Sequence, residues 1–289
     1  MISKIILGTV QFGLDYGINN AVGKVKKDEV FNILDEAYNR NVRVLDSAKA
    51  YGDAHSVIGL YHKNRPRNKF QIITKLPHEF NSAEVERKIH EYCNELNVER
   101  LNTLMFHSYD SYKKNEIILE KLFDLKTIGL IEKLGVSVYD NLQAENVIKD
   151  NRIDLIQLPF NLLDNRTLRG ELLKFAKNKG KVVHTRSAFL QGLFFIDRKS
   201  SVKHFNSLKN EIRKLDIISN DFNIPLQKLA LLYCLNQPEI DKVLIGVDGI
   251  NQLKSNLDIV DYPNLEQAFL EIDKIKVVNE NLLNPSKWN

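Results

Sequence analysis

Four residues whose side chains can move protons follow short apolar runs of this chain. Asp46 ends one run and Tyr51 comes five residues later; Lys75 and His107 end the next two runs. A tyrosine has an ordinary pKa of about 10, but a neighbouring ammonium group favours the phenolate and lowers that pKa. With Lys75 as the ammonium and Asp46 as its anchor, Tyr51 becomes a general acid or base. With His107 orienting a carbonyl oxygen, the set suits proton delivery to that oxygen as hydride reaches the carbon.

Each of these four residues also has a purely structural interpretation when it is taken alone. Asp46 could cap a helix, Lys75 could be a solvated strand end, His107 a satisfied core histidine and Tyr51 a half-buried ring. If the four residues converge on one rim of a fold, the chemical interpretation is favoured. Whether they converge depends on the strands and helices that carry them.

Eight short apolar runs alternate with longer stretches of helical period. Strands that alternate with single helices pair in parallel, because a parallel strand needs a crossover connection. Eight such units in 289 residues favour a closed (β/α)8 TIM barrel over an open doubly wound sheet. The expected strands cover residues 4–8, 42–45, 70–74, 101–106, 133–137, 153–158, 181–185 and 242–246.

The spacing of the polar residues supports one barrel. Asp46, Lys75, His107 and Ser137 are 29, 32 and 30 residues apart, and Gln157 and Arg186 occupy the ends of the sixth and seventh runs. Active sites of such barrels lie at the C-terminal ends of the strands. The interval before the eighth run is doubled and holds an extra helix near 205–220. We therefore expect a single α/β domain over residues 1–289, with extra C-terminal helices.

Composition excludes several classes of function. The balance of 41 basic and 37 acidic residues gives a charge of only +4, too weak to indicate nucleic acid. No run approaches the roughly 18 apolar residues of a membrane span, and no cleavage-type site follows the first run. Cys93 and Cys234 lie far apart, as expected of reduced structural thiols. These features predict a cytoplasmic protein, with no membrane partner and no metal, since the seven histidines form no HxH or HxxxH pair.

Three motifs in order, "LDSAKAYG", "ITK" and "LMFHS", resemble the aspartate, tyrosine, lysine and histidine tetrad of the aldo-keto reductases. The resemblance extends to "GTVQFG", "GVS", "IQLPFN", "SAFLQGLF" and the segment from 225 to 257. It implies NADP or NAD as cofactor, a small-molecule carbonyl substrate, and Asp46, Tyr51, Lys75 and His107 as the catalytic set, with Tyr51 as proton donor. "GTVQFG" lacks the GxGxxG spacing of a Rossmann phosphate loop.

The same resemblance implies the residues that hold the cofactor. Ser137 and Gln157 would bind the nicotinamide carboxamide, and Arg186 stands where many relatives have an aromatic ring under the nicotinamide, which a planar guanidinium could replace. The loop from Ser187 to Leu193, with Gln191 and Gly192, would meet the pyrophosphate. Gln252 and Asn256, opening the last helix, would face the adenosine end, beside Gly246 and Asp248.

The choice between NADP and NAD turns on Asp248. Relatives that prefer NADP usually have lysine or arginine here, whereas this chain has Gly246, Val247 and Asp248. A carboxylate repels a 2′-phosphate but can accept a hydrogen bond from a ribose 2′-hydroxyl. Lys254 is the nearest basic alternative. Our hypothesis is a preference for NAD or a relaxed use of both cofactors.

Substrate and oligomeric state are not determined by the sequence. The opening "GTVQFGLDYGINN" resembles reductases of bacterial sugar pathways, which suggests a sugar-like aldehyde or ketone. The tail, with the only tryptophan, Trp288, could cover the pocket or pack outside the barrel. Two rival functions remain: a cofactor-binding regulatory protein of the same fold with little turnover, and a metal-dependent barrel isomerase or hydrolase, which the histidine pattern disfavours.

Overall fold

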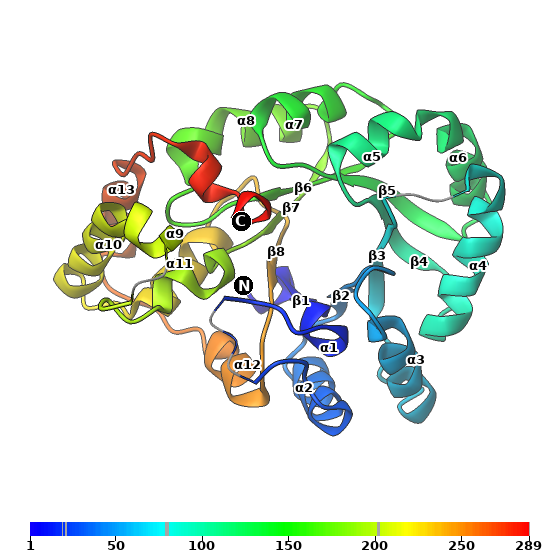
Figure 1. Cartoon of the computed structure of the whole chain (residues 1–289), viewed down its shortest axis with the longest axis horizontal. Coiled ribbons are helices and arrows are strands. Elements are labelled where there is room, and N and C mark those ends of the chain that lie inside the picture. The colour runs from blue at the N-terminus through cyan, green and yellow to red at the C-terminus, as the bar shows by residue number, and fades with distance from the viewer. Residues whose placement is uncertain (19, 21, 79–80, 201–202, 289) are drawn as a thin grey trace.

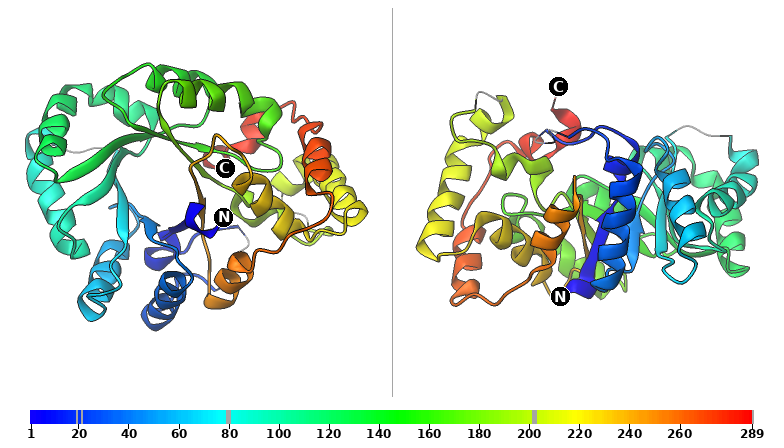
Figure 2. Two further views of the ribbon diagram at one scale, coloured as in Figure 1. Left: turned by 180° about the vertical axis from the view of Figure 1, so that it is seen from behind. Right: turned by 90° about the horizontal axis from the view of Figure 1, so that it is seen from below.

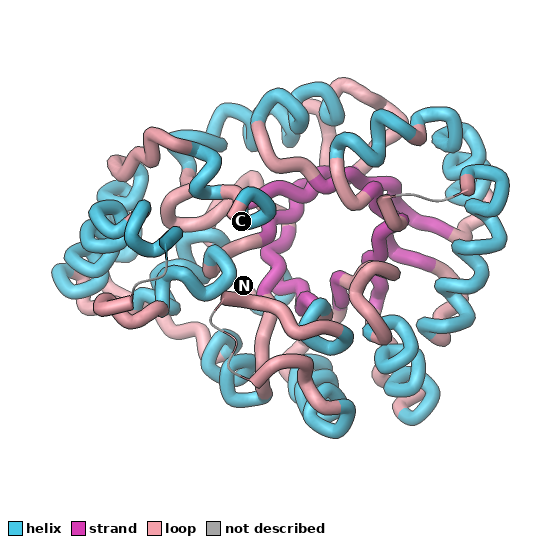
Figure 3. The backbone as a smooth tube through the Cα atoms, viewed as in Figure 1, coloured by secondary structure: helices cyan, strands magenta, loops and turns pink. Residues whose placement is uncertain are grey.

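Eight parallel strands close into a barrel in the order of the chain, and β8 pairs with β1 to complete it. The computed structural model describes residues 1–18, 20, 22–78, 81–200 and 203–288. Figure 3 shows the strands as a ring with helices outside it. The predicted barrel is confirmed, and every predicted apolar run overlaps a strand. The strands are β1 (Ile5–Gly8), β2 (Val44–Asp46), β3 (Gln71–Leu76), β4 (Leu101–Phe106), β5 (Ile131–Ser137), β6 (Leu155–Pro159), β7 (Val182–Arg186) and β8 (Lys242–Ile245).

Helices cover the outside of the barrel (Figure 1). The α-helices are α1 (Val10–Gly13), α2 (Lys27–Asn39), α3 (Ala54–Asn64), α4 (Val85–Leu96), α5 (Tyr109–Lys114), α6 (Leu119–Thr127), α7 (Asn141–Ile148), α8 (Arg166–Asn178), α9 (Lys203–Ser207), α10 (Lys209–Asp221), α11 (Leu226–Leu235), α12 (Ile250–Leu257) and α13 (Leu265–Asp273). Short 3₁₀ segments are η1 (Ile2–Lys4), η2 (Ser82–Glu84), η3 (Glu116–Ile118), η4 (Leu190–Phe195), η5 (Glu280–Leu283) and η6 (Pro285–Lys287).

The doubled interval before β8 holds α10, the extra helix that the sequence predicts near 205–220, and also the short α9, which the sequence did not predict, in addition to α11. One detail of the prediction is wrong: the helix that carries Gln252 and Asn256 is α12, and α13 follows it. None of the described helices is long and apolar enough to cross a membrane.

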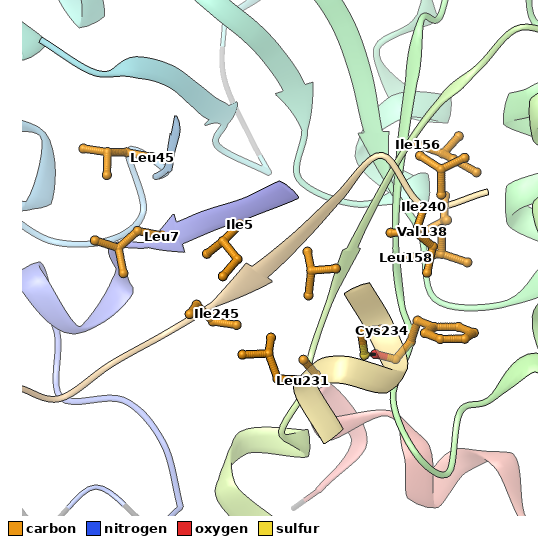
Figure 4. Close-up of a cluster of buried hydrophobic side chains, with 14 of the residues drawn as sticks. Ile5, Leu7, Leu45, Val138, Ile156, Leu158, Leu231, Cys234, Ile240 and Ile245 are labelled. Carbon is orange, nitrogen blue, oxygen red and sulfur yellow. Dashed lines mark hydrogen bonds between the residues drawn. The ribbon is translucent and has the colours of Figure 1, made fainter. Parts of the chain in front are cut away.

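Alternation along each strand separates two hydrophobic clusters. Ile5 and Leu7 point outward into the large cluster between strands and helices, while Ile6 points into the barrel. Figure 4 shows part of the outer cluster, where the Cys234 thiol donates to the Phe160 carbonyl at 3.4 Å. Inside the barrel a small apolar plug fills the centre, made of Ile6, Val44, Ile73, Met105 and Leu155.

The inward side chain two residues beyond this plug is polar on several strands. Successive inward positions on a strand are two residues apart, so Val44 is followed by Asp46, Ile73 by Lys75 and Leu155 by Gln157. The plug therefore fills the barrel on the N-terminal side of the polar residues. The polar residues form the next layer toward the C-terminal ends of the strands. This layer is the floor of the site.

Both cysteines are buried and free, as the sequence predicts. Burial raises the pKa of the Cys93 thiol to about 11, and it raises the pKa of Cys234 as well. Neither is an activated nucleophile, because only a lowered pKa would populate the thiolate.

Candidate active site

A cavity of about 710 Å³ lies at the C-terminal ends of the strands. Its volume falls in the range of about 300–1,000 Å³ that is usual for small-molecule and cofactor sites. Every predicted site residue borders it except Leu193. Those that do are Asp46, Tyr51, Lys75, His107, Ser137, Gln157, Arg186, Ser187, Gln191, Gly192, Gly246, Asp248, Gln252 and Asn256.

An ion pair between Asp46 and Lys75 occupies the floor of the cavity. The Lys75 ammonium donates to Asp46 Oδ1 and, at 3.1 Å, to the Ser47 carbonyl, and both charged side chains are 3% exposed. The second carboxylate oxygen of Asp46 accepts from Gln157 Nε2 at 2.9 Å. Burial lowers the pKa of Lys75, but the charges of Asp46 and Tyr51 raise it, and the net direction is upward. Lys75 is therefore an ammonium at neutral pH.

Tyr51 lies half-buried above this pair, on the loop between β2 and α3. The Lys75 ammonium is 5.3 Å from the centre of its ring. The His107 ring meets the Tyr51 ring edge to face, with their centres 6.0 Å apart. The structure thus gathers the four residues that the sequence singles out, from three strand ends and one loop.

The expectation that Lys75 gives Tyr51 a lowered pKa is wrong in its net direction. Burial, which disfavours the phenolate, is the largest influence and raises the pKa of Tyr51. Lys75 lowers the pKa through its charge and a hydrogen bond, and Asp46 raises it again. The sequence pattern indicated that the Lys75 ammonium lies near Tyr51, but it did not indicate how deeply Tyr51 is buried. Tyr51 is consequently a protonated phenol in this structure.

His107 is a neutral imidazole. Burial and the Lys75 charge, followed by His78 and Arg186, lower the pKa of His107 to about 3. Its ring stacks on His78, with centres 4.9 Å apart, and its Nδ1 has no hydrogen-bond partner among the described residues. A neutral imidazole can donate one hydrogen bond from the protonated nitrogen, which is the role expected of His107.

A close backbone contact holds the Tyr51 loop. A Cβ on Gly13, in α1, would lie 1.8 Å from the Tyr51 carbonyl oxygen, so no larger residue fits there. Gly52 adopts a φ of +55°, and a Cβ on it would lie 2.5 Å from the Gly13 carbonyl oxygen. The last residue of the motif "GTVQFG" and the residue after the tyrosine therefore fix the Tyr51 backbone together.

The loop after β7 turns its backbone toward the cavity. Ser187, Leu190, Gln191 and Gly192 all have positive φ, of 62°, 46°, 54° and 86°. Residues in this conformation can direct backbone N–H groups to one side and form a concavity suited to anions. Leu193 is different: the kink at Gln191 and Gly192 turns it inward, where it is completely buried in the hydrophobic core. The expectation that Leu193 meets the cofactor is therefore not supported.

The opposite end of the cavity lies at the start of α12. Asp248 accepts from Gln252 Nε2 at 3.2 Å, and its own N–H donates to Gln252 Oε1 at 2.9 Å. Asn256 accepts a hydrogen bond from Gln227 at 2.6 Å. Glu29, on α2, accepts from the N–H of Ile250, the first residue of α12, at 2.8 Å. Carboxylates thus surround this helix N-terminus.

Sequence reasoning missed several residues that border the cavity. Gln11 belongs to the motif "GTVQFG", and its buried Oε1 has no partner among the described residues. Tyr16 accepts from Gln191 Nε2 at 2.9 Å and so joins the loops after β1 and β7. The motif could have indicated Gln11 as a cavity residue. Tyr16 lies in a loop whose sequence has no periodic pattern that would have indicated it.

The C-terminal tail lies at the mouth of the site. In the right panel of Figure 2 the two termini lie at opposite ends of the barrel, and the C-terminus is on the side of the strand ends. Pro285 and Ser286 border the cavity, while Trp288 stacks on His204, with ring centres 4.8 Å apart. The structure therefore favours the covering tail over the tail packed outside the barrel.

Comparison with known proteins identifies the family. The model of the aldo/keto reductase family matches residues 4–277. The chain belongs to the aldo/keto reductase family. It is 24% identical to the protein named uncharacterized oxidoreductase YqkF of Bacillus subtilis (strain 168), over 89% of this chain and 86% of the relative. It is also 24% identical to L-galactose dehydrogenase of Arabidopsis thaliana, over 93% of this chain and 89% of the relative. Family membership makes the protein an oxidoreductase.

Solved structures of the family share the fold. An aldo-keto reductase from Bacillus halodurans, in its holo form, superposes with a TM-score of 0.75 at 19% identity, covering 96% of this chain and 94% of that one. The glycerol dehydrogenase of Gluconobacter oxydans superposes with a TM-score of 0.71 at 18% identity, covering 93% and 90%. Among the described residues no three His, Cys, Asp or Glu side chains converge as metal ligands.

The residues present fit a nicotinamide dinucleotide, the cofactor general to the family. Ser137 and Gln157 are register neighbours on β5 and β6, and the Gln157 amide is anchored on Asp46 through its nitrogen, which leaves its oxygen to accept from a carboxamide. The unpartnered oxygen of Gln11 is a further acceptor on the cavity wall. The left-handed loop after β7 suits a pyrophosphate, between these groups and α12.

The close contact at Gly13 generates a first prediction. Gly13→Ala should destabilise the protein by about 1–3 kcal/mol or more, because the added methyl must push α1 away from the Tyr51 backbone. Urea unfolding measures the loss. Gly170→Ala is the matched control: it adds the same methyl within α8, where the nearest atom is the Arg166 side chain at 3.1 Å, and should change stability by less than about 1 kcal/mol. Equal stability losses in both variants would contradict the prediction.

Proposed function

We propose that this protein reduces an aldehyde or ketone to the alcohol, using NADH or NADPH, with Tyr51 as the proton donor. The observation that carries the proposal is the cluster of Tyr51, Lys75, Asp46 and His107 at one end of a cavity able to hold a dinucleotide. The reduced nicotinamide supplies the hydride that the carbonyl carbon receives. The protein supplies the proton that the carbonyl oxygen needs.

The state of Tyr51 suits a proton donor. Because burial raises its pKa, the phenol keeps its proton at neutral pH until the carbonyl oxygen becomes basic. The phenolate left after transfer faces the Lys75 ammonium, which Asp46 holds in place. Charge that develops during the reaction is thus met by a cation already positioned for it.

His107 completes the arrangement as a neutral hydrogen-bond donor. Its lowered pKa keeps it from carrying a charge that would repel Lys75. A donor beside Tyr51 can orient a carbonyl oxygen toward the phenol without competing to protonate it. The roles of proton donor and orienting group are therefore assigned to different side chains.

For the substrate we propose a sugar-like aldehyde or ketone. The opening motif resembles sugar-pathway reductases, and the similarity to L-galactose dehydrogenase runs over 93% of the chain. Tyr16 and Tyr139 border the cavity beside Tyr51 and offer both an apolar face and a hydroxyl, which suits a polyhydroxylated carbon chain.

For the cofactor we propose a preference for NAD over NADP. If the nicotinamide lies at Tyr51, the adenosine must lie toward α12, at the other end of the cavity. There a 2′-phosphate would meet the carboxylate of Asp248, which borders the cavity. Glu29 does not border the cavity but adds negative charge at the start of α12. Glu29 also accepts the hydrogen bond from the first N–H of α12, a group that would otherwise attract a phosphate. Lys254, the basic alternative, does not border the cavity.

Tyr51→Phe tests the proton donor. We expect kcat for aldehyde reduction to fall by about 100-fold or more, the usual contribution of a general acid, with cofactor affinity preserved. Activity is followed by the loss of reduced-nicotinamide absorbance, across a panel of aldehydes and sugars. Tyr112→Phe is the control, since its hydroxyl donates to Asp150 away from the cavity. A wild-type protein that binds cofactor but reduces no carbonyl would favour the regulatory alternative.

The pH dependence of reduction follows from the two shifted groups. The pKa of Tyr51 is raised, so the donor loses its proton only above its ordinary pKa of about 10, and His107, with a pKa of about 3, stays neutral above pH 5. We expect kcat/KM for reduction to be flat between about pH 5 and 9. Initial rates across this range measure it. An acid limb near pH 6.5 or an alkaline limb below pH 9 would contradict the assigned protonation states.

Removing the two carboxylates near α12 tests the cofactor preference. We expect NADH to bind the wild type more tightly than NADPH. In the double variant Glu29→Gln with Asp248→Ser, the ratio of the NADPH to the NADH dissociation constant should fall by about tenfold, because the repulsion of the 2′-phosphate is removed. Fluorescence titration of both reduced cofactors gives the affinities. Glu120→Gln, on α6 and outside the cavity, should leave the ratio unchanged. Tighter binding of NADPH than of NADH to the wild type would contradict the proposed preference for NAD.

A further inference from the structure

Arg186 places a positive charge in the cavity that no carboxylate of the described residues pairs with at ion-pair distance. Its side chain is half-buried at the end of β7, and it borders the cavity. One terminal nitrogen donates to the Val138 carbonyl at 3.2 Å and the other makes a long contact of 3.5 Å with the Ser187 hydroxyl. The guanidinium carbon lies 4.1 Å from the centre of the Tyr139 ring. All of these partners are uncharged.

The buried carboxylates nearby are already neutralised by other cations. Asp46 is paired with Lys75 on the cavity floor. Asp164 accepts two hydrogen bonds from Arg169, at 2.6 and 2.9 Å. Arg186 therefore has no ion-pair partner of its own among the described residues, although its charge also reaches Asp164. The Arg186 charge lowers the pKa of His107, after burial, Lys75 and His78. It also lowers the pKa of Tyr51, against burial, which raises that pKa.

The guanidinium lies beside the residues that fit the nicotinamide carboxamide. Val138, whose carbonyl it contacts, directly follows Ser137, and Ser137 pairs in register with Gln157. On the next strand pair, Pro159 is the register neighbour of Arg186. A nicotinamide held by Ser137 and Gln157 would therefore have the Arg186 charge as a direct neighbour.

We propose that Arg186 makes this site discriminate between the two redox states of the cofactor, weakening the binding of the oxidised form. The inference rests on the proposed function. The oxidised nicotinamide ring carries a positive charge and the reduced ring is neutral, so a fixed cation repels only the oxidised form. The planar guanidinium can still stack on the reduced ring, as it does on Tyr139.

The consequence concerns binding and release rather than the chemical step. Repulsion between Arg186 and the oxidised ring opposes hydride transfer slightly, so it does not accelerate the chemistry. It speeds the departure of the oxidised product and keeps that product from competing with the reduced cofactor. A protein that works as a carbonyl reductase benefits from both effects.

The experiment compares three proteins: the wild type, Arg186→Gln and Arg186→Lys. Glutamine keeps a donor for the Val138 carbonyl but removes the charge, and lysine keeps the charge but removes the planar group. The dissociation constants of the reduced and oxidised cofactor are measured for each protein, by nicotinamide fluorescence and by competition, with whichever of NAD or NADP binds more tightly. Thermal unfolding confirms that each variant is folded, and Arg186→Leu provides a second neutral side chain.

We expect the ratio of the oxidised to the reduced dissociation constant to be about ten or more in the wild type. Arg186→Gln and Arg186→Leu should lower this ratio by roughly tenfold, mainly because the oxidised form binds more tightly, while Arg186→Lys should keep it. An unchanged ratio in the neutral variants, or an equal fall in Arg186→Lys, overturns the inference and leaves the proposed function standing. Failure of the wild type to bind any of the four cofactor forms overturns both.

Discussion

The ion pair between Asp46 and Lys75 is the interaction on which the rest of the site depends. Removing two charges from water costs several kcal/mol per ion, and the pair recovers this only if every remaining donor and acceptor is satisfied. Here the Ser47 carbonyl takes one Lys75 hydrogen bond and the Gln157 amide serves the second Asp46 oxygen. These partners come from β2, β3 and β6, so they meet only when the barrel is closed in its observed register.

That dependence explains the protonation state of Tyr51. A free ammonium beside a phenol would lower the phenol's pKa strongly, but Asp46 neutralises much of the Lys75 field, and burial opposes what remains. Burial, assisted by Asp46, thus keeps the phenol protonated against the Lys75 charge. In the proposed reaction, the same ammonium would face the phenolate once the proton has been transferred. One arrangement therefore serves both the resting and the reacted state of Tyr51.

The sequence predicts those parts of the site that periodicity determines. Asp46, Lys75, Ser137 and Gln157 lie two residues beyond buried inward positions of their strands, so recognising the strands was enough to place them. The net pKa of Tyr51 depends on burial, which the local sequence does not contain. Leu193 was predicted to meet the cofactor because the motif covers its loop, but the kink at Gln191 and Gly192 directs its side chain into the core instead of the cavity. Tyr16 and the tail residues Pro285 and Ser286 are positioned by tertiary packing alone.

The cavity has opposite fixed charges at its two ends, and this polarity bears on the orientation of a dinucleotide. Arg186 is uncompensated near the catalytic cluster, and Glu29 and Asp248 lie at the start of α12. A cofactor bound in reverse would place its adenosine beside Arg186 and its nicotinamide beside Asp248, whose carboxylate would attract the oxidised ring far from Tyr51. The forward orientation puts the neutral reduced ring beside Arg186 and the uncharged ribose hydroxyls beside the carboxylates. The charges on which the proposed NAD preference and the proposed discrimination between redox states rest therefore also favour the one orientation in which Tyr51 could donate its proton.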